Sequence, residues 1–132
     1  MAALTRDRNT QMQDASLLSV PLAAGVVIHA GGLTVANAQG WAAPGSTATA
    51  LIYLGRAEEA ADNTGGANGA KRVPVRRLRA FKWTNDGSVT QAHLMGLAYI
   101  VDDQTVASSD GGGTRSEAGR IVGIDPDGVW VE

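Results

Sequence analysis

Short apolar runs separated by glycine and proline are the main pattern of the chain from Ser16 onward. The first four runs span residues 17–20, 26–30, 33–36 and 49–54. Runs of this length and composition are typical of β-strands. Gly31 and Gly32 separate the second run from the third, and this dipeptide accepts the positive φ angles of a two-residue turn. We therefore predict a β-hairpin of residues 26–30 and 33–36.

Two segments in the first half of the chain have loop composition. Residues 41–46 contain Pro44 and Gly45, and residues 58–70 combine a short acidic, alanine-rich stretch with glycine and asparagine. A single helical turn over residues 56–62 is too short to be stable without tertiary support. We predict a surface loop for each segment.

The longest strand-like segment spans residues 71–83, and its alternation changes frame in the middle. One frame holds Val73, Val75, Phe81 and Trp83, and the other holds Leu78 and Ala80. Because side chains of a strand alternate between two faces, a change of frame indicates a β-bulge or a bend. We place it near residues 76–78.

The last third of the chain has the sharpest strand pattern. Residues 98–107 and 118–131 each predict two short strands, with turns at Asp102-Asp103 and over residues 125–128. Before them, residues 85–87 predict a turn and residues 90–95 a single helical turn. The fold class is all-β, a small sandwich or barrel-like domain with short strands and long loops over residues 15–132.

Residues 1–14 differ from the rest because they are polar and lack both strand alternation and a helical stripe. We predict an extended N-terminal arm, with a frayed terminus as the alternative. The segment has no apolar run behind a basic start, so it is not a secretory signal. The mostly apolar residues 17–30 are too few to span a membrane and are interrupted by Pro21 and Gly25.

Composition narrows the chemistry further. The 132 residues include 17 glycines and no cysteine, and the formal net charge is -2. Absence of cysteine excludes a disulfide framework, a thiolate metal site and a cysteine nucleophile. The slightly negative net charge produces no overall electrostatic field that would attract nucleic acid or an anionic membrane.

No motif predicts an enzyme, a metal site or a cofactor. His29 and His93 lie in no catalytic pattern, and Ser108-Ser109 carry no nucleophile-elbow signature. Asp102 and Asp103 are adjacent, so in a strand they point to opposite faces and do not converge as paired carboxylates. The glycine-rich residues 65–71 lack the spacing of a phosphate-binding loop.

One concentration of positive charge is a candidate binding surface. Six of the eleven cationic residues lie close together in sequence: Lys71, Arg72, Arg76, Arg77, Arg79 and Lys82. Phe81 and Trp83 are the only aromatic residues beside them for base stacking, and the overall balance is acidic. The alternatives to nucleic acid are a solvated strand face and a charged strand that pairs with Glu58, Glu59 or acidic residues of a neighbouring subunit. We favour a protein-facing role over nucleic acid, with Arg76, Arg77 and Arg79 as partner-binding residues.

The order of these segments resembles a known family. Residues 20–27 (Val-Pro-Leu-Ala-Ala-Gly-Val-Val), the apolar strands in the middle and residues 96–131 are similar to the capsid decoration, or cement, proteins of tailed bacteriophages, over residues 16–132 in all. The resemblance implies a structural protein, made in the cytoplasm of the host bacterium, that lies on the exterior of the virion. It would bind the major capsid protein of the expanded head, as a homotrimer at threefold and quasi-threefold positions, and stabilise the capsid.

The resemblance also implies a role for the arm, which in several such families adds a strand to a sheet of the capsid protein. The candidate contact residues there are Thr5, Arg6, Arg8, Asn9 and Thr10. The alternative function is a phage tail-associated or host-surface-binding β module, in which exposed loops such as residues 57–71 carry recognition.

Overall fold

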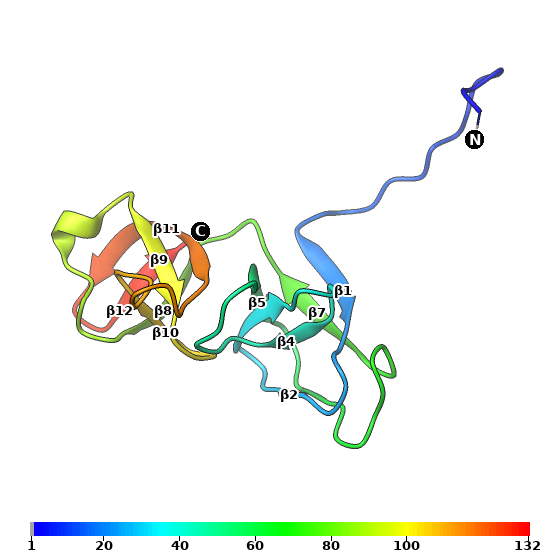
Figure 1. Ribbon diagram of the computed structural model, residues 1–132. Coiled ribbons are helices and arrows are strands. Elements are labelled where there is room, and N and C mark those ends of the chain that lie inside the picture. The colour runs from blue at the N-terminus through cyan, green and yellow to red at the C-terminus, as the bar shows by residue number, and fades with distance from the viewer. Residues whose placement is uncertain (1) are drawn as a thin grey trace.

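Strands dominate the computed structural model, which describes residues 2–132 (Figure 1). They make up 40% of the chain against 2% helix, so the predicted all-β class is confirmed. Met1, the first residue of the predicted arm, lies outside the described residues.

The first half of the chain forms an open, five-stranded antiparallel sheet. Its order is β1 (Leu17–Pro21), β7 (Arg72–Arg76), β5 (Ile52–Ala57), β3 (Leu33–Ala36) and β4 (Ala42–Pro44). β1 and β4 are therefore the two edge strands of this sheet.

The second half forms a small closed barrel, the other main body in Figure 1. Its strands are β8 (Phe81–Asn85), β9 (Leu97–Ile100), β10 (Thr105–Ala107), β11 (Glu117–Asp125) and β12 (Gly128–Val131). The closure order is β10-β8-β12-β11-β9, in which β8 and β10 are parallel and the other pairs antiparallel. The four strands predicted for the last third are β9 to β12, so that prediction is confirmed.

The predicted hairpin across Gly31 and Gly32 is wrong. Gly31 has the positive φ of 81° that a turn requires, but β2 (Val27–Ile28) pairs with β6 (Ala61–Asp62), and β3 pairs with β4 and β5. The physical reason is that Ile28 and Leu33 are buried in different hydrophobic clusters. The two segments therefore separate after the turn.

Three further local predictions are decided by the structure. Residues 41–46 are not a loop throughout, because Ala42–Pro44 is β4, and residues 58–70 contain the short strand β6. Both short strands gain stability from partner strands far away in sequence, which composition does not reveal. The helical turn is confirmed as the 3-10 helix η1 (Gln91–His93).

The predicted bend near residues 76–78 is confirmed, and it separates the two sheets. Residues 71–83 form β7 in the open sheet and β8 in the barrel. Between them Leu78 has a φ of 60°, in the left-handed region that branched side chains rarely adopt. This crossing brings the basic stretch to the junction of sheet and barrel.

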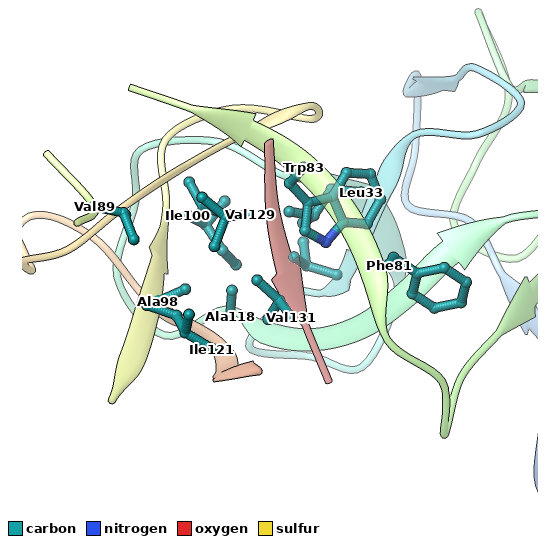
Figure 2. Packing of buried hydrophobic residues seen from close by; sticks show 12 residues of the cluster. Leu33, Phe81, Trp83, Val89, Ala98, Ile100, Ala118, Ile121, Val129 and Val131 are labelled. Carbon is teal, nitrogen blue, oxygen red and sulfur yellow. The ribbon is translucent and has the colours of Figure 1, made fainter. Parts of the chain in front are cut away.

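Two clusters of buried side chains form the core. The larger fills the barrel and includes Leu33 and Val35 of β3, which dock the open sheet on it (Figure 2). The smaller joins Ile28 of β2 to Val73 and Val75 of β7, together with Leu22, Ala42 and Ala57. The open sheet is thus fixed to the barrel on one side and to the β2–β6 ribbon on the other.

Candidate partner-binding surface

The N-terminal segment runs away from both sheets (Figure 1). Residues 2–15 are exposed and contain no strand or helix. The five candidate contact residues of the arm, Thr5, Arg6, Arg8, Asn9 and Thr10, are all exposed along it.

The root of the arm, in contrast, is held in a defined conformation. The Asp14 carboxylate accepts hydrogen bonds from the backbone N–H and the hydroxyl of Ser16, each at 2.8 Å. These bonds hold the pKa of Asp14 below its ordinary value. Arg77 donates from its guanidinium to the carbonyl of Ala15 at 3.0 Å and from its backbone N–H to that of Ser16 at 2.9 Å. Arg77 therefore fixes the point from which the arm leaves the body.

The arm continues directly into the edge strand β1, whose outer edge is partly blocked beyond its start. The bond from Arg77 N to Ser16 O is part of the β1–β7 ladder, so by alternation the backbone groups of Leu17, Ser19 and Pro21 face outward. Pro21 has no N–H, and the carbonyl of Ser19 already accepts a bond from Arg72 at 2.7 Å. The backbone groups of Leu17, beside the arm, and the N–H of Ser19 thus remain free on this edge within residues 2–132.

The basic stretch does not act as one patch. Arg72 is bound to Ser19, and Arg77 is bound to the arm root. Arg76, Arg79 and Lys82 come together in a groove between the open sheet and the barrel, joined there by Arg56 of β5. Sequence reasoning missed Arg56 because only the β5–β7 pairing, which sets Arg56 opposite Arg76, brings it into place.

We call this feature the basic groove. Its volume is about 490 Å³, and it is lined by Gly31, Arg56, Arg76, Arg79, Ala80, Phe81, Lys82, Trp83 and Trp130. Residues of β5 and β7 line one wall, and residues of β8 and β12 line the other. Four cationic and three aromatic residues thus line one groove.

Carboxylates of the same chain already neutralise part of this charge. Glu58 pairs with Arg56 at 2.5 Å and with Arg76 at 3.8 Å, and the hydrogen bond from Arg56 lowers the pKa of Glu58. Asp127 pairs with Lys82 at 2.9 Å, which lowers the pKa of Asp127. Within residues 2–132, Arg79 forms no salt bridge, and its guanidinium donates only to the carbonyl of Leu78. The charges of Arg76 and Arg79 also contribute to lowering the pKa of Asp14 at the arm root.

Cationic side chains lie over two of the three aromatic rings of the groove. The Arg56 guanidinium lies 4.9 Å from the centroid of the Phe81 ring, and the Lys82 ammonium lies 5.6 Å from that of Trp130. Phe81 and Trp83 are 8% and 5% exposed, while Trp130 is 36% exposed. Of the three rings, Trp130 therefore has the largest exposed surface, with the Lys82 ammonium beside it.

The two histidines lie outside the basic groove. The Nδ1 atom of His93 accepts the backbone N–H of Thr90 and caps η1, and His29 is exposed. No group of three or more histidine, aspartate or glutamate side chains suited to a metal ion occurs within residues 2–132. In the same part of the chain, no helix has the length and apolar character needed to cross a membrane.

No protein-family model, no curated protein and no solved structure matches this chain. Its function is therefore inferred from its own geometry.

Proposed function

We propose that this protein is a structural component of a bacteriophage virion that binds the outer surface of the expanded capsid and stabilises it by bridging neighbouring major capsid proteins. The observation that carries the proposal is the arm. Residues 2–14 are exposed and extend away from a compact β body, and they leave it beside the open start of edge strand β1. An exposed arm with a fixed root is suited to reaching a neighbouring subunit.

Strand addition is the proposed mode of binding. Thirteen extended residues reach about 43 Å, at about 3.3 Å per residue, which is enough to cross onto an adjacent subunit. Backbone hydrogen bonds to a sheet edge of the capsid protein supply affinity, and the side chains of Thr5, Arg6, Arg8, Asn9 and Thr10 set the register.

Stabilisation then follows from linkage. A protein that binds the assembled, expanded lattice in preference to its dissociated subunits shifts the equilibrium toward the lattice. Many such contacts repeated over one shell add avidity. The proposal includes no cofactor, nucleic acid or membrane, and it places the protein on the capsid exterior after synthesis in the host bacterial cytoplasm.

A homotrimer at threefold and quasi-threefold positions is part of the proposal. The edge strands β1 and β4 each have a single partner strand in the open sheet, and a bridge between Leu22 and Ala42 joins their edges only at one end. Ile52 of β5 is 63% exposed. Cyclic assembly covers such edges and apolar side chains. Sedimentation equilibrium of the free protein and of the capsid-bound form tests the trimer separately from capsid binding.

The decisive experiment is cosedimentation of the purified protein with expanded heads built from the major capsid protein of its own genome, with unexpanded proheads as the control. We expect saturable binding to expanded heads only. Absence of binding to both would overturn the proposal in favour of the tail-associated or host-surface-binding alternative. Removing residues 1–14 should weaken binding without unfolding the body, and unchanged affinity would remove the arm from the mechanism.

A second pair of variants tests whether the backbone of the arm provides the affinity. The double substitution Gln11→Pro and Met12→Pro removes two successive N–H donors, which in an extended chain point to opposite sides. Gln11→Ala with Met12→Ala changes the same side chains, which lie outside the five candidate contact residues, but keeps both donors. Strand addition predicts that the proline pair loses binding and the alanine pair retains it.

A further inference from the structure

The proposed binding through the arm does not involve the residues of the basic groove. Four cations, three aromatic residues, Gly31 and Ala80 line it, and Arg79 forms no salt bridge within residues 2–132. Its ligand preference follows from this arrangement and goes beyond the decoration role.

We propose that the basic groove binds an acidic peptide segment of a partner protein. A carboxylate of the segment pairs with the guanidinium of Arg79, and a neighbouring aliphatic side chain lies against Ala80 and the exposed surface of Trp130. The volume of about 490 Å³ exceeds what a single carboxylate needs and suits a short stretch of extended chain.

The first argument for a carboxylate comes from the groove itself. Glu58 already lies between Arg56 and Arg76, and Asp127 already pairs with Lys82. The cations of the groove therefore already bind carboxylates of the same chain. The guanidinium of Arg79 is the remaining group that can bind a further carboxylate. A guanidinium binds a carboxylate through two parallel N–H donors, which gives direction as well as affinity.

The second argument separates a peptide from a nucleic acid. Single-stranded nucleic acid is bound by stacking bases on open aromatic faces. Here Arg56 covers Phe81, Lys82 lies over Trp130, and Trp83 is almost completely buried.

The test uses the purified full-length chain and a synthetic hexapeptide of alternating glutamate and leucine, acetylated and amidated at its ends. The comparison peptide has glutamine in place of each glutamate, and a hexathymidylate is the nucleic-acid probe. Calorimetric titration measures affinity, and amide chemical shifts of Ala80, Lys82 and Trp130 report whether the peptide lies in the groove.

We expect the acidic peptide to bind about tenfold or more tightly than the glutamine peptide, because charge-assisted hydrogen bonds are about twice as strong as neutral ones. Arg79→Gln should lower the affinity for the acidic peptide about tenfold, the loss expected for one charged hydrogen-bond partner. The matched control is Lys71→Gln, which removes the same charge from an exposed position outside the groove and should change affinity less than about twofold.

Equal affinity for the two peptides, or an unchanged affinity in Arg79→Gln, would overturn the proposal. Tighter binding of hexathymidylate than of the acidic peptide would assign the groove to nucleic acid instead. Arg79 is exposed, so its substitution leaves the core intact, and a circular dichroism spectrum checks the fold. Peptide binding by a chain that does not bind expanded heads would support the groove and remove the decoration role, so the two proposals fail separately.

Discussion

The indole Nε1 of Trp83 donates a hydrogen bond of 3.1 Å to the hydroxyl of Tyr53 and thereby joins β8 of the barrel to β5 of the open sheet. Tyr53 packs against the larger core cluster, to which Trp83 belongs. Burial raises the pKa of Tyr53 to about 12, and the bond from Trp83 only partly offsets this effect. The contact is thus a titratable link between the two halves of the fold.

This link predicts a loss of stability at alkaline pH. The folded-state pKa of about 12 lies above the ordinary value of 10.0, so the folded protein retains a proton that the unfolded chain loses. Between these values the free energy of unfolding falls as pH rises, by up to about 1.4 kcal/mol per pH unit. Urea denaturation from pH 8 to 11.5 measures the slope.

Tyr53→Phe is the matched variant for that slope. At neutral pH it should cost about 1–3 kcal/mol, because the nearly buried Trp83 Nε1 loses its acceptor. Above pH 10 its stability should fall less steeply than that of the natural protein. Parallel profiles for the two proteins would contradict the assignment of the alkaline loss to Tyr53.

A second prediction concerns Asn63, whose side chain is buried inside the loop between β5 and β7. Its amide donates to the carbonyls of Ala23 at 2.9 Å and Ala67 at 3.0 Å. Asn63→Asp removes both donors and places a negative charge beside two carbonyl oxygens, so it should destabilise the protein by more than about 2 kcal/mol. Chemical denaturation measures the loss, and Asn68→Asp in the exposed part of the same loop is the control, with an expected loss below about 1 kcal/mol. Equal losses would show that Asn63 does not hold the loop.

These contacts also show where sequence reasoning succeeds. The turn at residues 125–128, the helical turn at η1 and the bend after Arg76 depend on local residue preferences, and the structure contains all three. The strands β9 to β12 follow from alternation of apolar residues over a few positions.

The remaining features depend on residues that are far apart in sequence. The partner of β2 is decided by which core buries Ile28, and the basic groove requires Arg56 to lie opposite Arg76. Asn63 has the composition of an ordinary loop residue, and its burial depends on Ala23, 40 positions away. The alternation of apolar and polar residues along a single sequence does not indicate any of these long-range pairings.

A third prediction tests the close approach of β5 to β7. A Cβ atom at Gly55 would lie 2.0 Å from the carbonyl oxygen of Arg76, and Gly55 has a φ of 144°. Gly55→Ala should therefore force the two strands apart and cost more than about 3 kcal/mol. Gly40→Ala is the control, because Gly40 also has a positive φ but has open space around it, and about 1 kcal/mol is expected there. Equal thermal shifts in the two variants would show that backbone conformation alone, and not the contact with Arg76, determines the cost.

A fourth prediction addresses the root of the arm. Arg77→Ala removes the guanidinium bond to Ala15 but keeps the backbone bond to Ser16, so the body should stay folded while the arm root loosens. The NMR order parameter of the Ala15 amide should fall from about 0.85 toward 0.6, and Arg8→Ala, which changes an exposed residue of the arm, should leave it unchanged. Under the proposed function the looser root also weakens binding to expanded heads several-fold, because ordering the arm then costs more conformational entropy on association. A rigid Ala15 in Arg77→Ala would mean that the Asp14–Ser16 hydrogen bonds alone hold the root, and Asp14→Ala would then be the variant that releases it.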